Sequence, residues 1–171
     1  MRPRSHRMLG GLVAAMLVLL ADQASKYWIL DVLDLERWHS VAVLPLLNFT
    51  MVWNRGITFG LNDHAGASVL LPMLAALAVV GGLCVWMWRA ERPTVSAALG
   101  AICGGAIGNV IDRLRFGAVV DFIHAHAFGW SWYVFNLADA AIVCGVGVLI
   151  LDSLRPPALP TVPAKTNQSA P

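Results

Sequence analysis

Charged residues are scarce in this sequence. Asp, Glu, Lys and Arg make up 13% of its 171 residues and hydrophobic residues 58%, whereas charged residues form about 25% of a typical soluble domain. The net charge of +2 is small and is not gathered into a basic stripe, so no nucleic-acid partner is predicted. A chain of this length and apolarity can form one compact unit and is predicted to be a membrane protein.

Cysteine is rare as well, with three residues, Cys84, Cys103 and Cys144, each inside an apolar run. An odd count without C-x-x-C spacing argues against a disulfide framework and against a zinc site. We interpret the three side chains as small hydrophobic groups in helix interfaces.

The sequence also lacks the motifs of several hydrolase classes. It contains no G-x-S-x-G, no H-E-x-x-H and no serine beside a histidine in a way that suggests a triad. The nearest approach to a metal pair is His124 and His126, which would point to the same side of an extended strand. No third ligand accompanies them in the sequence, so we predict neither a metal ion nor a cofactor.

Long apolar runs are abundant. Four segments are candidates to cross the roughly 30 Å core of a bilayer, which needs about 20 helical residues. They are predicted at residues 8–30, 69–88, 95–111 and 133–151. The first also has the basic start and apolar core of a secretory signal peptide, but its apolar character resumes at residues 27–30, which favours a retained span. We therefore predict an all-α membrane fold in which residues 1–152 form one four-helix domain.

Basic residues predict the orientation of these spans. With both termini in the cytoplasm, the inner side carries seven basic and two acidic residues, and the outer side five basic and eight acidic. The positive-inside rule therefore predicts a multi-pass protein of the cytoplasmic membrane with both termini inside. The proline-rich residues 153–171 are predicted to form a disordered cytoplasmic tail. Tryptophans at the predicted span ends, which favour the headgroup region, are Trp28, Trp86, Trp88, Trp130 and Trp132.

The longer outer segment, residues 31–67, is predicted to contain short strands. Residues 41–44 and 47–53 are apolar or alternating stretches bounded by Pro45 and Gly56. Such a pattern is typical of strands, and we expect these two to lie on the outer surface of the membrane.

Polar residues at the span ends form the candidate site. An ionisable side chain within a span costs about 2.5 kcal/mol or more, so its presence needs a reason. The predicted topology places these groups in one layer near the outer surface. They are Asp22 and Lys26 in the first span, Asn109, Asp112 and Arg113 in the third, and Asn136 and Asp139 in the fourth.

Two interpretations of the charged pairs remain open. Asp22 and Lys26 are four residues apart and can form an ion pair on one helix face. Pairs such as Asp22–Lys26 and Asp112–Arg113 could belong to the site, or they could only hold the helices together.

Glycines give the third span one smooth face. Gly100, Gly104 and Gly108 recur at every fourth residue, a pattern that allows another helix to approach closely. We expect this packing to bring Asn109 and Arg113 against a neighbouring helix.

Two carboxylates are the candidates for chemistry. Asp121 lies in the shorter outer segment, residues 114–134, between apolar neighbours that favour a raised pKa. Asp139 lies near the start of the fourth span, and the intervening segment is short enough to bring the two together. Neighbouring carboxylates share a proton, so that one activates a water while the protonated one polarises a carbonyl. This arrangement of aspartic proteases needs no metal and no covalent intermediate.

Five ordered blocks connect these residues to a known family. In them, and over residues 8–151, the chain resembles the bacterial lipoprotein signal peptidases. Ile57 and Thr58 depart from the family pattern, which more often has small residues there. The blocks are DQASK at 22–26, NRGITFG at 54–60, GGAIGNVIDR at 104–113, VVDFI at 119–123 and FNLAD at 135–139.

The resemblance implies four transmembrane helices with a small extracytoplasmic β-sheet cradle, in the bacterial inner membrane with the site near its outer face. It implies an aspartic endopeptidase that removes the signal peptide of prolipoproteins before a cysteine carrying diacylglycerol. We expect a monomer whose partners are prolipoproteins, membrane lipid and globomycin-type inhibitors. Asp121 and Asp139 match the catalytic pair. Residues expected to support the site or to bind substrate or inhibitor are Asp22, Lys26, Asn54, Gly56, Gly108, Asn109, Asp112, Arg113, Asn136 and Ala138.

Two other function classes place charges in a membrane. A small transporter or proton-coupled channel would have a charge near the bilayer midplane and often carries inverted repeats, whereas the charges here gather at one end without a visible repeat. A non-catalytic assembly or chaperone subunit would use its ion pairs only for packing. Cleavage of a prolipoprotein distinguishes a peptidase from both.

Overall fold

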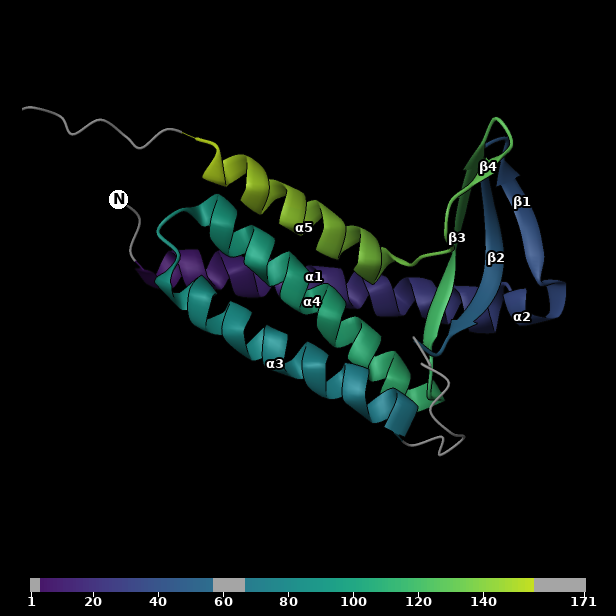
Figure 1. The fold of residues 1–171 in the computed structure, drawn as a ribbon, viewed down its shortest axis with the longest axis horizontal. Helices are drawn as coiled ribbons and strands as arrows, with labels where there is room; N and C mark the ends of the chain where they lie inside the picture. Colours follow the sequence, from purple (N-terminus) through teal and green to yellow (C-terminus); the bar gives the residue numbers. More distant parts are fainter. Residues whose placement is uncertain (1–3, 57–66, 156–171) are drawn as a thin grey trace, which may run out of the picture.

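Four long helices form a bundle, and a small antiparallel sheet lies across one end of it (Figure 1). The computed structural model describes residues 4–56 and 67–155, so Ile57, Thr58 and nearly all of the predicted tail lie outside the described residues. The predicted combination of a mostly helical chain with a small sheet is confirmed. The long helices are α1 (Arg4–Tyr27), α3 (Ala67–Arg89), α4 (Pro93–Phe116) and α5 (Leu137–Ser153).

Among the described residues, three helical segments are long and apolar enough to cross a membrane, at Ser5–Val32, Leu70–Arg89 and Pro93–Phe116. Helix α5 is equally apolar in sequence but has 17 residues. It begins at Leu137, four residues later than the predicted span, because Asn136 caps its first turn. An N-cap residue has extended backbone, so the helix begins only after it.

Helix α4 lies at the centre of the bundle and packs against α1, α3 and α5 (Figure 1). A Cβ atom at Gly100 or Gly104 would collide with backbone carbonyl oxygens of Gly11 and Ala15 in α1. The smooth glycine face therefore serves the close approach of α1, as expected from its spacing.

The cysteines do not all lie in such interfaces. Cys103 of α4 is buried, but Cys84 and Cys144 are exposed on α3 and α5. The side chain of Cys84 lies next to that of Cys103, so these two have the interface position expected from the sequence, and Cys144 does not.

The sheet has the strand order β1-β2-β3-β4. Its strands are β1 (Ser40–Leu44), β2 (Leu47–Asn54), β3 (Val119–Ala127) and β4 (Trp130–Ser131). The two strands expected in the longer outer segment are β1 and β2. Asp121, expected in a loop, lies instead in β3 opposite Val52. Its valine and isoleucine neighbours favour a strand, and β2 provides the partner that local sequence could not show.

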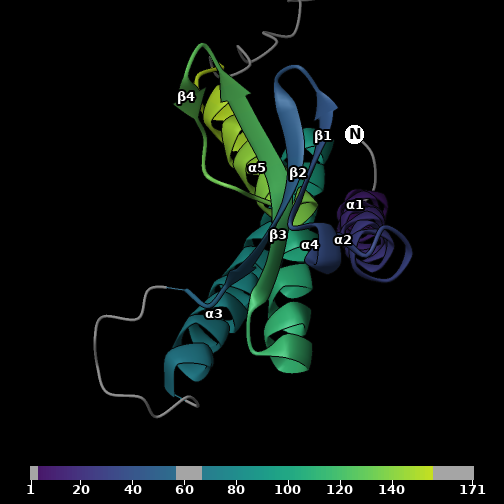
Figure 2. The same ribbon diagram turned by 90° about the vertical axis from the view of Figure 1, so that its right-hand side faces the viewer.

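A hydrophobic core joins the sheet to the end of α1. After Tyr27 the helix continues as a short π-helix, η1 (Trp28–Val32), followed by α2 (Leu35–Trp38). Ile29 and Leu35 of these segments are fully buried against Val120 and Phe122 of β3. Viewed from the sheet side, β3 crosses the end of the bundle in front of α4 (Figure 2). This packing fixes the position of Asp121, which lies between the two buried strand residues.

Candidate active site

A buried polar cluster lies where the sheet meets the ends of α1, α4 and α5. Side chains from these helices and from β2 and β3 form one connected hydrogen-bond network, and most of them are less than a tenth exposed. Buried polar groups are stable only when their hydrogen bonds are satisfied. The network contains two separate pairs of carboxylates.

The first pair shares one lysine. Lys26 Nζ lies 2.8 Å from Asp22 Oδ2 and 2.6 Å from Asp112 Oδ2, and all three side chains are buried. Lys26 also donates to Asn109 Oδ1 at 3.2 Å. Gln23 Nε2 donates to Asp112 Oδ1 at 3.0 Å and to Asp22 Oδ2 at 3.2 Å. We call Asp22, Lys26 and Asp112 the charged brace.

The charged brace holds two backbone segments. Ala138 N donates to Asp22 Oδ1 at 3.1 Å, and Val120 N donates to Asp112 Oδ2 at 3.1 Å. These amides belong to the residues immediately before Asp139 and Asp121. The brace therefore ties the backbone at both candidate catalytic residues to one buried charge centre.

Gly108 leaves room for this arrangement. A Cβ atom there would lie 2.5 Å from Asp22 Oδ2, closer than carbon and oxygen approach without displacement. Ala138, the small residue expected at the site, is fully buried and contributes its backbone N–H.

The second pair is Asp121 and Asp139, which we call the open pair. Asn136 Nδ2 donates to Asp121 Oδ1 at 2.7 Å, and Asn54 Nδ2 donates to Asp121 Oδ2 at 3.0 Å. Asn109 Nδ2 donates to Asp139 Oδ1 at 2.9 Å. Among the described residues, no lysine, arginine or histidine forms an ion pair with either carboxylate. Asp121 is buried and Asp139 is half-buried.

Asp139 is also part of the cap of α5. Its backbone N–H donates to Asn136 Oδ1 at 2.9 Å, and its Oδ2 accepts from Asn136 N at 3.3 Å. This capping box fixes the rotamer of Asp139 in the first helical turn, where the helix dipole stabilises a negative charge.

Burial raises the pKa of Asp121 to about 6. The nearby charge of Asp139 acts in the same direction, whereas the hydrogen bonds from Asn54 and Asn136 and the positive charge of Lys26 lower this pKa. A raised pKa agrees with the expectation from its apolar neighbours, and it allows this carboxyl to hold a proton near neutral pH.

Arg113 does not pair with Asp112. Its Nη1 donates to the carbonyl oxygen of Asn109 at 3.1 Å, and Asp112 pairs with Lys26 instead. Consecutive side chains on a helix diverge too far to face each other, so the Asp112–Arg113 pair considered from the sequence is wrong.

Gly56 has a left-handed φ of 81° and donates its N–H to Asn54 Oδ1 at 2.9 Å, which orients that amide toward Asp121.

Gln23 is a member of the network that the sequence analysis does not include among the site residues, although its position in the sequence gives a usable signal. It lies beside Asp22 in the polar end of the first span, where any uncharged polar residue also needs partners.

His124 and His126 do lie together on β3, with ring centroids 5.8 Å apart. Within residues 4–56 and 67–155, no group of three potential ligands could hold a metal ion.

A family model described as signal peptidase (SPase) II matches residues 14–155. A protein named lipoprotein signal peptidase from Methylorubrum extorquens (strain PA1) is 52% identical over 147 residues, which are 85% of this chain and 86% of that protein. One from Nitrobacter hamburgensis is 47% identical over 156 residues, which are 86% of this chain and 94% of that protein.

Two solved structures, both described as bacterial membrane enzymes determined by the in meso method, share this fold at 28% sequence identity. The first, at 2.3 Å resolution, has a TM-score of 0.70 and covers 84% of this chain and 87% of its own. The second, at 1.9 Å, has a TM-score of 0.73 and covers 85% and 92%.

Proposed function

This chain belongs to the signal peptidase II family, and on that premise we propose that it is an aspartic endopeptidase that removes signal peptides from prolipoproteins. The bond cleaved is the one before the cysteine that carries diacylglycerol. One observation carries the proposal: the open pair brings two aspartates into a shared amide network, and within residues 4–56 and 67–155 neither carboxylate forms an ion pair. Two such carboxylates ionise together only with difficulty, so they share a proton.

We assign the acid to Asp121 and the base to Asp139. The raised pKa of Asp121 favours its protonated form, which leaves the base to Asp139, the second carboxylate of the pair, in the first turn of α5. Asp139 takes a proton from a water, whose oxygen attacks the scissile carbonyl carbon. Asp121 donates its proton to the carbonyl oxygen, giving a neutral tetrahedral intermediate.

Breakdown of the intermediate uses the same two groups in reversed roles. Asp139, now protonated, donates to the leaving amide nitrogen as the carbon–nitrogen bond breaks. Asp121 takes back the proton from the hydroxyl oxygen as the new carbonyl of the carboxyl product forms. The pair returns to its starting state, which requires neither a metal nor a covalent intermediate.

The amides and the charged brace would act by positioning. Asn136 contacts both aspartates of the open pair, and the brace holds the amides of the preceding residues. Reacting groups must be held within fractions of an ångström for efficient catalysis. We expect Asn54, Gly56 and Arg113 to line the approach of the substrate or of a globomycin-type peptide inhibitor.

The same proposal places the bundle in the bacterial inner membrane with four spans and both termini cytoplasmic. Seventeen residues of α5 rise about 25 Å, close to the hydrocarbon thickness. The open pair would then lie near the outer face, at the depth of a bond whose cysteine keeps its lipid chains in the bilayer. We expect a monomer, because all members of both carboxylate pairs come from one chain.

A cleavage assay tests the proposal. The full-length protein in detergent is mixed with a diacylglyceryl-modified prolipoprotein, and Asp121→Asn and Asp139→Asn are compared with the wild type. Asp152→Asn, which alters a carboxylate paired with Arg92 far from the site, is the matched control. Wild-type rates in a folded Asp121→Asn or Asp139→Asn protein would rule out the role of that residue, and inhibition by chelators would rule out the metal-free mechanism.

A further inference from the structure

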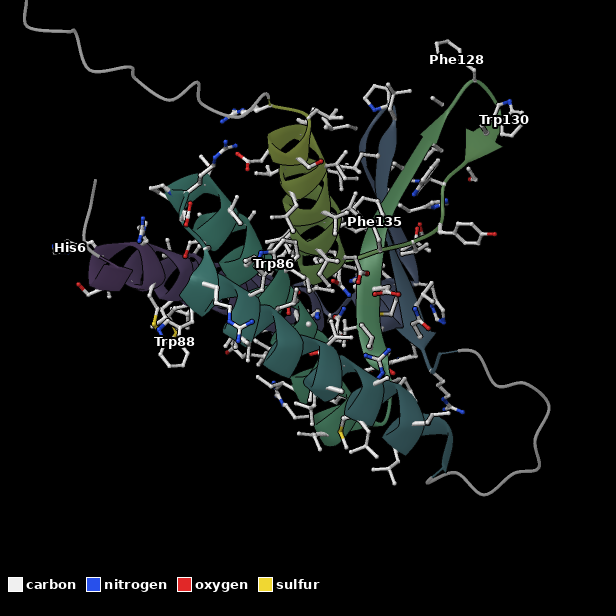
Figure 3. The ribbon with its side chains drawn as sticks, turned by 60° about the vertical axis from the view of Figure 1, so that its left-hand side comes forward. His6, Trp86, Trp88, Phe128, Trp130 and Phe135 are labelled. Atoms are coloured by element: carbon white, nitrogen blue, oxygen red, sulfur yellow. The ribbon has the colours of Figure 1, made fainter. Side chains whose placement is uncertain are left out.

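Exposed aromatic side chains lie at the far end of the sheet and in the segment that leads from β4 back toward α5. Phe128 is 99% exposed, Trp130 83%, Trp132 71% and Tyr133 89%. We call these four residues the aromatic tip. Figure 3 shows Phe128 and Trp130 at the end of the β3–β4 hairpin, directed away from the helices. Exposed aromatic clusters of this kind mark surfaces that contact a partner.

The turn at the tip presents an aromatic residue in an unfavourable backbone conformation. Ala127 pairs with Trp130, so Phe128 and Gly129 form a two-residue turn, with φ of 51° and 83°. Turns with two positive φ values favour Asn-Gly or Asp-Gly, and a bulky side chain is rarely found there. The ring of Phe128 is exposed and packs on little of its own chain, so it adds little to the stability of the fold. A contact outside the protein would account for an aromatic residue at this position.

A second apolar turn lies beside the tip. The β1–β2 connection exposes Leu44 by 59% and Leu46 by 56%, and His126 N donates to the carbonyl oxygen of Leu46 at 3.0 Å. Between Asp121 and Asp139 the sequence contains no Asp, Glu, Lys or Arg. The end of the sheet is therefore apolar and rich in aromatic residues, and its ionisable side chains are those of His124 and His126.

The position of the tip indicates the partner. The strands run across the axes of the helices, and the tip extends sideways past the end of α5 (Figures 1 and 2). With the bundle axis along the membrane normal, as in the proposed function, a sideways extension follows the bilayer surface. Trp and Tyr favour the headgroup region, where the ring is apolar and its N–H or O–H remains hydrated.

We propose that the aromatic tip is a membrane-interface anchor that inserts into the outer leaflet of the phospholipid bilayer beside the bundle. It is separate from the spans and from the open pair. Because the tip is the end of β3, contact with the lipid surface fixes the depth of the strand that carries Asp121. This inference rests on the proposed membrane placement, and it does not depend on peptidase activity.

Tryptophan quenching tests the anchor. The full-length protein is reconstituted in vesicles of phosphatidylcholine and phosphatidylglycerol with brominated acyl chains. The emission of Trp130 and Trp132 is obtained by subtracting a Trp130→Phe/Trp132→Phe variant from the wild type. Trp86→Phe/Trp88→Phe gives a matched reference pair on α3, also exposed, at 50% and 64% (Figure 3). We expect both pairs to lose most of their emission to brominated lipid and little to aqueous iodide.

Each other quenching result overturns the anchor. Strong quenching of the tip pair by iodide alone places the tip in water. Protection from both quenchers indicates contact with a second copy, and protection only after prolipoprotein is added indicates contact with substrate. Failure of lipid quenching at both pairs overturns the membrane placement as well, whereas loss of cleavage with normal quenching leaves the anchor intact.

One substitution separates lipid contact from turn structure. Phe128→Asn suits the left-handed backbone and should form the turn at least as well, but it removes the apolar ring. We expect weaker quenching of Trp130 and Trp132 by brominated lipid together with unchanged thermal stability. Unchanged quenching would exclude Phe128 from the anchor.

Discussion

The charged brace and the open pair are two carboxylate pairs in one buried network, and they differ in how their charge is compensated. Lys26 bridges Asp22 and Asp112 directly. Within the part of the chain that the structure describes, the hydrogen-bond donors to Asp121 and Asp139 are amides of Asn54, Asn109 and Asn136.

This difference separates structure from chemistry. Removing one partner of a buried, hydrogen-bonded ion pair strongly destabilises the folded protein. The brace is therefore suited to hold the backbone in place. A carboxylate pair without a cation must retain a proton, which makes it an acid and a base at once. Both pairs are buried polar clusters that are costly to form. They differ in the groups that contact the carboxylates, a lysine in one pair and amides in the other.

The largest effect is expected from neutralising one member of the open pair. Asp139→Asn removes the base, and kcat should fall by about 10³-fold or more. The thermal stability should stay close to that of the wild type, because the amide is isosteric and the negative charge that acts on Asp121 is removed. Cleavage rates and thermal unfolding in detergent measure both effects. Loss of folded protein instead of activity would make the open pair structural.

The charged brace should show the opposite behaviour. Lys26→Met leaves two buried carboxylates without their cation, which we expect to destabilise the protein by about 3–5 kcal/mol. Thermal unfolding in detergent measures the loss. Adding Asp112→Asn to Lys26→Met should recover part of the stability, since one uncompensated charge is removed. Equal stability of Lys26→Met and the wild type would contradict the role of the brace.

A smaller effect is expected from crowding the brace. Gly108→Ala places a methyl group against Asp22 Oδ2, and overpacking of this kind costs about 1–3 kcal/mol. Gly10→Ala, at a helical glycine with open space around it, is the control and should be neutral or slightly stabilising. Thermal unfolding of the two variants should therefore diverge, and a parallel response would show that α1 can move away from α4.

The smallest effect concerns the pH dependence of the open pair. Burial raises the pKa of Asp121 to about 6, and the hydrogen bond from Asn54 lowers it. An acid must hold its proton, so kcat/KM should fall as pH rises through that pKa. Asn54→Ala removes a donor to the anion, raises the pKa further and should move the falling limb to higher pH. Asn48→Ala, on the same strand but opposite His124, should leave the limb in place.

The same pKa shift has a defined sign for stability. The folded pKa lies above the ordinary value of 3.8, so protonation favours the folded state. The contribution of Asp121 to stability is full below about pH 3.8 and is lost as pH rises through about 6. A shift of the unfolding midpoint to higher temperature with rising pH across this window, absent from Asp121→Asn, would contradict the raised pKa.

Part of the site was predictable because membrane chemistry makes polar residues conspicuous. Asp22, Lys26 and Asp139 were identified by their cost within apolar segments, and the i, i+4 spacing predicted the Asp22–Lys26 pair correctly. The glycine period predicted the contact between α4 and a neighbouring helix, and β1 and β2 followed from apolar patterning. Each of these signals is local in sequence.

Other features depended on contacts between distant segments. Asp121 was predicted in a loop, because the strand it belongs to forms only when β2 pairs with β3. Asp112 was matched with its neighbour Arg113, and its true partner, Lys26, lies 86 residues earlier in the chain. The hydrogen bonds from Val120 and Ala138 to the brace are backbone contacts, which residue identities do not encode.

The sequence by itself determined which groups are present: an apolar chain, four carboxylates at the candidate site, a lysine spaced to meet one of them, and a family pattern. Only the tertiary structure decided which carboxylates form ion pairs with the lysine and which, among the described residues, form none. The reason is physical, since a buried charge is set by whatever lies within a few ångströms in space. Helix packing at Gly100, Gly104 and Gly108 and the pairing of β2 with β3 set those distances.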